Sequence, residues 1–244
     1  MMKYLLLFFM VCTLTLNAKD VVNVSYIAGE PTEEDWKLVQ ACPLVPANPA
    51  TTYGEAIVRR CGMDKKVIEP ATVRLLWSNK YLYVRIDAID SDIVAQSTKD
   101  QDYLFVQGDT VEIFLKPENV PYYWELYGDV SNHKTAIFIP SRGRLGLPNN
   151  RSPKADMELT VKTQCNGTLN DMSDHDKGWM MVVQIPVSGL TRHGAEFKPG
   201  AKWTFCLVRY NYSQYLPMWE RTVYPGLSNE PHLYEEFANI VLEK

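Results

Sequence analysis

The chain has 244 residues, of which 46% are hydrophobic and 22% charged, which suits one large domain or two small ones with an ample core. Its net charge of −4 excludes the cationic face that a nucleic-acid-binding or polybasic membrane-surface protein needs. The 6 Trp, 14 Tyr and 8 Phe are core fillers first, but a chain this rich in Tyr and Trp often shows some at a binding surface.

The first 18 residues have the pattern of a secretory signal peptide. Lys3 supplies a positive flank, residues 5–16 form an apolar run, and Ala18 ends it. The run is too short for a transmembrane span. We therefore expect a signal peptide over residues 1–18 and a secreted or periplasmic mature chain over residues 19–244.

A short helix and a β-hairpin are predicted next. Thr32 followed by Asp35 forms a capping box, which predicts a helix start. Residues 42–62 are rich in proline and are predicted to be a loop. Residues 72–77 and 81–89 are rich in β-branched and aromatic residues and are separated by a three-residue turn, which predicts a hairpin.

Three carboxylates cluster where this hairpin ends. Asp87, Asp90 and Asp92 have a spacing at which loop carboxylates can chelate calcium, which takes several oxygen ligands. Aspartates at such positions also form turns by bonding their own backbone. The sequence leaves both readings open, so the three residues are a candidate calcium site.

The central predicted strand covers residues 110–116. Val111, Ile113 and Leu115 alternate with Glu112 and Phe114, the period of a strand with two different faces. If the three aliphatic residues face a core, Glu112 lies on the other face beside an aromatic ring. This carboxylate is then either a solvated surface group or an acceptor for the hydroxyls of a sugar.

Further strands follow at short spacing, with turn signals and almost no helix between them. They are predicted over residues 122–127, 135–139, 157–163, 178–186, 203–211 and 237–242, with a helical turn over 187–190 and long loops over 140–153 and 212–224. This pattern predicts an all-β fold, an antiparallel β-sandwich of jelly-roll-like form with few short helices. No change in composition divides the mature chain, so one domain over 19–244 is expected.

The cysteines permit disulfides in an exported chain. The mature chain has four, which allow three pairings. A bridge between Cys42 and Cys61 would staple the proline-rich loop, and this pairing is expected ahead of one between Cys165 and Cys206. The alternative is four free thiols.

Motifs for catalysis are missing from the sequence. It lacks the nucleophile elbow, the zinc-protease motif, the P-loop and the dinucleotide fingerprint. A glycosidase needs two carboxylates at a set separation, and Glu112 with Glu125 on the next strand is the pair to consider. No motif supports that pair.

Several segments together resemble the family 9 carbohydrate-binding module and its secreted relatives. The resemblance covers the chain from about Trp36 to the end, and its most specific element is Asp109-x-Val111-Glu112-Ile113-Phe114. The segments are TVRLLWSNKYLYVRIDAIDSDI, GDTVEIFLKP, YYWEL, GWMMVVQIPVSGL, WTFCLVRYN and FANIVL. The resemblance implies a β-sandwich that binds saccharides, commonly at chain ends, between stacked aromatic rings, often with structural calcium.

The same resemblance suggests the site residues. Glu112 matches the family's glutamate that accepts hydrogen bonds from sugar hydroxyls, and Trp219 matches one of its two sandwiching tryptophans. The other tryptophan is expected at Val106, where Tyr103 or Phe105 could take its place. From strand position alone we add Trp124 and Arg209, for which core packing and a structural ion pair are the alternatives.

The sequence thus predicts non-catalytic binding of a polysaccharide or oligosaccharide, with glycan-degrading enzymes of the same pathway as further partners. Two other classes remain open. One is a glycan-degrading enzyme with a sandwich fold. The other is a degenerate module with a structural, protein-binding or haem-binding role; haem would require an axial Met/His pair.

Overall fold

The computed structural model describes residues 19–47, 54–143 and 157–244, and strands dominate them. The helices are short: α1 (Glu33–Leu38), α2 (Glu55–Arg60), α3 (Val187–Leu190) and two 3-10 turns, η1 (Leu104–Val106) and η2 (Tyr234–Glu236). The strands are β1 (Val21–Tyr26), β2 (Cys42–Pro43), β3 (Val45–Pro46), β4 (Ala71–Trp77), β5 (Tyr81–Ala88), β6 (Thr110–Pro117), β7 (Tyr123–Asp129), β8 (Lys134–Ile139), β9 (Thr160–Asn166), β10 (Gly178–Pro186), β11 (Trp203–Asn211), β12 (Glu220–Tyr224) and β13 (Ala238–Leu242).

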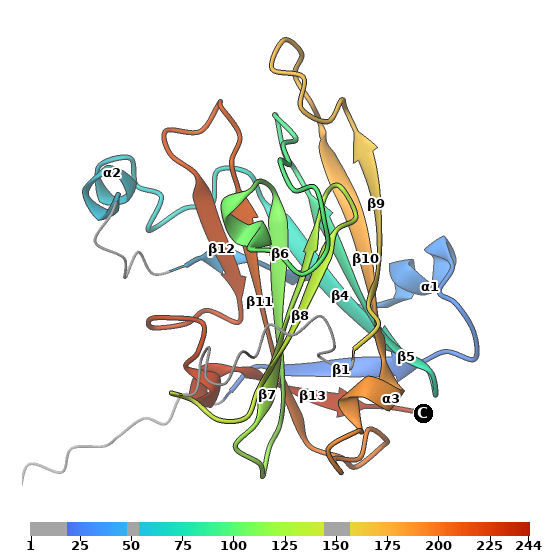
Figure 1. Ribbon diagram of the computed structural model, residues 1–244. Helices are drawn as coiled ribbons and strands as arrows, with labels where there is room; N and C mark the ends of the chain where they lie inside the picture. Colours follow the sequence, from blue (N-terminus) through green and yellow to red (C-terminus); the bar gives the residue numbers. More distant parts are fainter. Residues whose placement is uncertain (1–18, 48–53, 144–156) are drawn as a thin grey trace, which may run out of the picture.

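The strands form one large sheet whose main path runs β8-β7-β6-β11-β13-β1-β4-β5-β10-β9 (Figure 1). β12 extends it beside β11, and β3 pairs with β12, while β2 pairs with β4. The path nearly closes on itself, since Thr163 of β9 donates its backbone N–H to Asn132 in the β7–β8 turn at 2.7 Å. The all-β expectation is therefore confirmed.

β1 joins the two halves of the sheet. Its first four residues pair in parallel with β13, and its last two, Ser25 and Tyr26, pair in parallel with β4. All other strand pairings in the described ranges are antiparallel.

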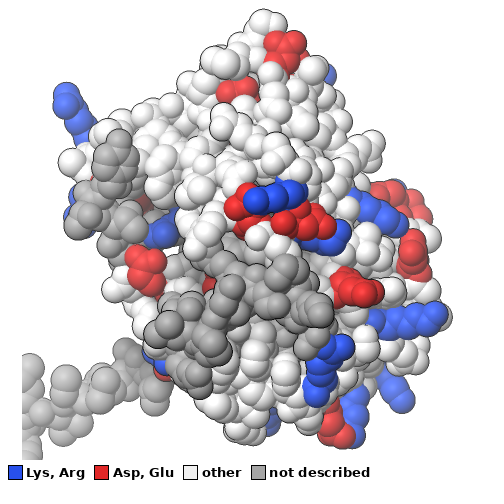
Figure 2. All heavy atoms as spheres, in the orientation of Figure 1, with Lys and Arg blue, Asp and Glu red and all other residues white. Residues whose placement is uncertain are grey.

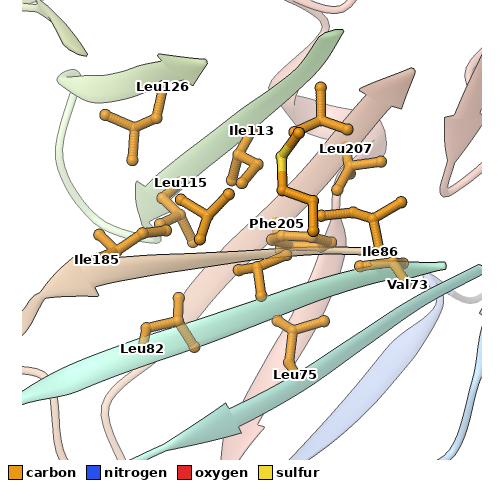
Figure 3. Packing of buried hydrophobic residues seen from close by; sticks show 14 of the residues in the cluster. Val73, Leu75, Leu82, Ile86, Ile113, Leu115, Leu126, Ile185, Phe205 and Leu207 are labelled. Atoms are coloured by element: carbon orange, nitrogen blue, oxygen red, sulfur yellow. The ribbon is translucent and has the colours of Figure 1, made fainter. Parts of the chain in front are cut away.

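The main core lies between the two halves (Figure 3). Alternating side chains of β4, β5 and β10 point toward alternating side chains of β6, β7 and β11, and they include Val73, Leu75, Leu82, Ile86, Ile185, Ile113, Leu115, Leu126, Phe205 and Leu207. Burying a side chain of this size contributes roughly 1.5–3 kcal/mol before entropy is counted.

A second apolar cluster covers the outer face of the half built on β6. Its buried members include Phe114, Tyr123, Tyr127, Val208 and Tyr210. Every residue of β6 is buried, because one face packs in the main core and the other beneath this cluster. The prediction that Val111, Ile113 and Leu115 face the core, with Glu112 on the opposite face, is confirmed.

Most elements predicted from local patterns are present. The Thr32–Asp35 capping box opens α1 with both reciprocal hydrogen bonds, and the predicted hairpin forms β4 and β5. The loop prediction for residues 42–62 is wrong, because this segment contains β2, β3 and α2. β1 and β12 also lie outside the predicted strands, and β9 begins three residues later than expected.

The disulfide prediction is wrong. Cys42, Cys61, Cys165 and Cys206 are all free. Cys42 is buried in β2 against the core, whereas Cys61 is exposed just after α2. Cys206 lies inside β11, on the face of the second apolar cluster, and Cys165 lies in β9 of the other half.

Two sequence-based expectations concern location in the cell. The predicted signal peptide, residues 1–18, lies outside the described residues. Within the described ranges, no helix is long and apolar enough to span a membrane.

The surface charge agrees with the composition. On the face drawn in Figure 2, acidic and basic side chains are interspersed with wide uncharged areas, so this face presents no extended cationic patch.

Candidate functional site

The site is organised by Gly108 and Asp109 at the start of β6. Gly108 has φ +138°, and a Cβ there would lie 2.3 Å from the carbonyl oxygen of Val94, so only glycine allows the preceding loop to approach this closely. Asp109 is fully buried, and its carboxylate accepts backbone N–H groups of Val94 at 2.7 Å and Tyr212 at 2.9 Å. Asp109 thereby fixes two loops, one leading into η1 and one leading to Trp219.

Glu112 lies on the outer face of β6, and its carboxyl group is held by two tyrosines. The hydroxyl oxygen of Tyr127 on β7 lies 2.6 Å from Oε1, within hydrogen-bond distance, and Tyr210 of β11 donates its hydroxyl to Oε2 at 2.9 Å. Sheet register explains the arrangement, because Tyr127 pairs directly with Glu112 and Tyr210 lies diagonally from it. Only 4% of Glu112 is exposed.

A second carboxyl group, that of Glu125, shares the same tyrosine. The hydroxyl of Tyr127 also forms a hydrogen bond with Oε1 of Glu125. Glu125 is on β7, two residues before Tyr127, and is 8% exposed. We call Glu112, Glu125, Tyr127 and Tyr210 the carboxyl floor.

Burial governs the protonation of the carboxyl floor. Burial and, second, the neighbouring charge of Glu125 together raise the pKa of Glu112 to about 8, against the two tyrosine hydrogen bonds that lower it. Burial also raises the pKa of Tyr127 and Tyr210 well above the ordinary range. At neutral pH Glu112 therefore keeps its proton, and both phenols stay protonated.

Aromatic rings from the two loops lie around this floor. Phe105 of η1 stacks on Tyr127 with ring centres 6.1 Å apart and approaches Tyr210 at 5.6 Å. Trp219 approaches the same Tyr210 at 6.3 Å and stacks on Tyr212 at 6.0 Å. Tyr103 is half exposed and meets the edge of Phe105. We call Tyr103, Phe105, Tyr212 and Trp219 the aromatic rim.

Four predicted site residues thus come together: Glu112, Trp219, Phe105 and Tyr103. Val106, the position of the expected second tryptophan, lies in η1 and is 60% exposed, and its neighbour Phe105 supplies the ring beside the floor. Tyr212 also bonds Phe105 directly, its hydroxyl donating to the Phe105 carbonyl oxygen at 2.6 Å.

Trp124 and Arg209 do not join this site. Trp124 pairs with Leu115 and so lies on the core face, where it stacks on Trp203 at 5.8 Å and is 1% exposed. Arg209 pairs with Val111 on that same face. It is fully buried, donates to two backbone carbonyls and forms an ion pair with Asp90 at 3.1 Å. Trp124 is therefore a core-packing residue and Arg209 forms a structural ion pair, the two alternatives to a role in binding.

The calcium prediction does not fit the structure. Asp87 is held between Arg74 at 2.6 Å and Arg85 at 2.8 Å, and Asp90 faces Arg209 in the core. Asp92 is buried and accepts a backbone N–H of the loop after β11. Two of the three charges are compensated by arginines, and no group of three metal-binding side chains exists among the described residues.

The sequence analysis considered Glu125 only as a possible catalytic partner of Glu112, and it missed Tyr127, Tyr210 and Tyr212 as parts of this site. Their signal is the two-residue alternation of β7 and β11, which places residues 125, 127 and 210 on one face. That they share a face with Glu112 follows only from the register of strands that are distant in sequence.

The fold and the site together define an all-β binding domain, in which partly exposed aromatic rings surround buried carboxyl groups. A family model described as carbohydrate family 9 binding domain-like matches residues 62–195, more than half of the chain. The chain belongs to this family.

Solved structures of other proteins share this fold. The chain is similar to a protein from Bacteroides uniformis whose description assigns it to carbohydrate binding, with 14% identity, a TM-score of 0.67 and coverage of 93% of this chain and 100% of that one. It is also similar to a family 9 carbohydrate-binding module from Caldicellulosiruptor kristjanssonii. The complex of that module with cellotriose matches with 18% identity and a TM-score of 0.53, and the match covers 92% of this chain and 94% of that one. Its complex with glucose matches with 16% identity and a TM-score of 0.54, and that match covers 92% of this chain and 96% of that one. At these identities the likeness is one of fold. The search of curated proteins found no match.

Proposed function

We propose that the protein binds saccharides, without catalysis, at the carboxyl floor and the aromatic rim. The observation that carries the proposal is that Phe105 and Trp219 both contact Tyr210, whose hydroxyl bonds Glu112. Sugar rings present C–H faces that pack on aromatic planes, and their hydroxyls require placed donors and acceptors. Membership of the family supports the same function.

The proposal extends to the organisation of the chain. We infer one β-sandwich domain over residues 19–244 that follows a cleaved signal peptide over 1–18 and acts outside the cytoplasm. The two sheet halves with a shared core and matches that span nearly the whole chain support the single domain. Such a domain would retain a glycan close to the enzymes that degrade it.

A binding screen tests the function. The mature chain is applied to a glycan array, and its affinities for cellotriose and for the array hits are measured by calorimetry. Trp219→Ala is expected to weaken binding at least tenfold, because it removes a ring from the rim. Tyr81→Ala, which removes a partly buried ring from the other half of the sheet, should leave affinity unchanged. Absence of binding to every saccharide would overturn the proposal.

A further inference from the structure

The two carboxyl groups of the floor differ in how many of their oxygens already take part in a hydrogen bond. Each oxygen of Glu112 is already engaged in a hydrogen bond with a tyrosine hydroxyl. Glu125 bonds Tyr127 through Oε1 only. Its Oε2 makes no hydrogen bond within the described part of the chain and is not fully buried. Glu125 is also twice as exposed as Glu112, at 8% against 4%.

One tyrosine proton cannot serve two carboxylates. Tyr127 has a single hydroxyl hydrogen, yet its oxygen lies within hydrogen-bond distance of both Glu112 and Glu125. The two contacts are satisfied together only if one carboxyl group brings its own proton. A protonated Glu112 then donates to the tyrosine oxygen, and Tyr127 donates to Glu125.

Nearby charges favour one ionised carboxyl at the floor rather than two. Among the described residues, no ion pair includes Glu112 or Glu125, so an extra negative charge at the floor would lack a direct counter-ion. The titratable groups near the two carboxyls are Tyr123 and Tyr127 on β7, Cys206 and Tyr210 on β11, and His232 in the loop before η2. Arg221 on β12 acts on the hydroxyl of Tyr210. Burial lowers the pKa of His232, which keeps that ring neutral at pH 7.

We propose that Glu125 is a specificity-determining residue of this site. Its free Oε2 accepts a ligand hydroxyl, while Glu112 holds a proton and positions Glu125 through Tyr127. The inference rests on the proposed saccharide binding, and it assigns the direct contact to a residue that the family motif does not contain. The ligand class follows: a neutral saccharide with a hydroxyl donor, since an anionic sugar would meet a carboxylate.

Affinity measurements separate the two carboxyls. With cellotriose or the best array hit as the probe, Glu125→Gln should weaken binding at least tenfold, since the amide that replaces the carboxylate is the poorer acceptor. Glu112→Gln, which replaces a protonated carboxyl by an amide of the same shape, should weaken binding less than Glu125→Gln does. Glu118→Gln, an exposed residue paired with Lys202, is the matched control. A larger effect for Glu112→Gln than for Glu125→Gln would overturn the contact assigned to Glu125.

A ligand-free experiment tests the proton order on its own. The carboxyl carbon of Glu112 is followed by NMR against pH in the wild type and in Glu125→Gln. Removal of the neighbouring charge should move the Glu112 midpoint to lower pH by at least half a unit. An unchanged midpoint would overturn the coupling even if saccharides bind. If no saccharide binds the wild type, the proposed function and the ligand contact fail together, and the coupling stands or falls by this titration.

Discussion

Replacing Glu112 by glutamine should remove a pH dependence from the stability of the protein. Burial and the neighbouring charge of Glu125 raise the pKa of Glu112 from an ordinary 4.5 to about 8, so between these values the folded chain holds a proton that the unfolded chain releases. The free energy of unfolding therefore falls as pH rises through this window and levels off above it. Glutamine has the size of the protonated side chain and does not titrate.

The magnitude follows from the linkage. One proton held by the folded state alone changes stability by about 1.4 kcal/mol per pH unit. Between pH 6 and pH 8 the stability of Glu112→Gln relative to wild type should thus increase by about 2–3 kcal/mol. Differences between the two proteins are used because other groups, His232 among them, titrate equally in both.

Urea unfolding at pH 6, 7, 8 and 9 provides the measurement, and Glu118→Gln reports the effect of losing an exposed carboxylate. A difference between Glu112→Gln and wild type that stays constant from pH 6 to pH 8 would refute the argument, because it would mean that Glu112 is ionised throughout. A difference that grows by more than about 1 kcal/mol between pH 8 and pH 9 would place the proton loss higher than the structure indicates.

Two other substitutions and one thiol reagent test the surrounding structure. Asp109→Ala should lower the free energy of unfolding in urea by about 2–4 kcal/mol, since it leaves two backbone N–H groups without their acceptor. A loss within the roughly 0.5 kcal/mol typical of a surface substitution would contradict the role of Asp109 in fixing both loops. Trp124→Phe should lower stability by about 1–3 kcal/mol through lost packing and leave saccharide affinity within twofold, and a tenfold loss of affinity would place it in the site after all. In the native mature chain a thiol reagent should label Cys61 fast, while Cys206 reacts only on unfolding because burial raises the pKa of its thiol; fewer than four thiols in the unfolded chain would reveal a disulfide.

Local patterns predicted the strands that carry their own signal. β10 and β11 have the predicted boundaries, because each is a long run of β-branched and aromatic residues between turns. β1 carries the same alternation, with Val22 and Val24 buried, and could have been found. β2 and β3 are two residues long, and only their partners β4 and β12 make them strands.

Prediction of the site was limited in the same way, because local patterns do not specify how distant strands pair. The motif around Glu112 and the tryptophan at 219 were accessible through family resemblance. The exclusion of Arg209 needed the register of β11 against β6, which places it on the face opposite Glu112. The free cysteines likewise depend on which strands carry them, and spacing along the chain contains no such information.

The placement of β1 determines when the fold can be completed. β1 lies between β13 and β4, so the first strand of the described chain needs the last one as its neighbour. Val22 pairs with Ile240, a contact that closes a loop of nearly the entire chain. Loops of this size form late in folding, because closing them costs conformational entropy before stabilising contacts are made. The two sheet halves can each form early from hairpins, but the main path of the sheet becomes continuous only when both ends of the chain meet. Loss of the final strand would therefore interrupt the main path of the sheet at its middle rather than fray an edge.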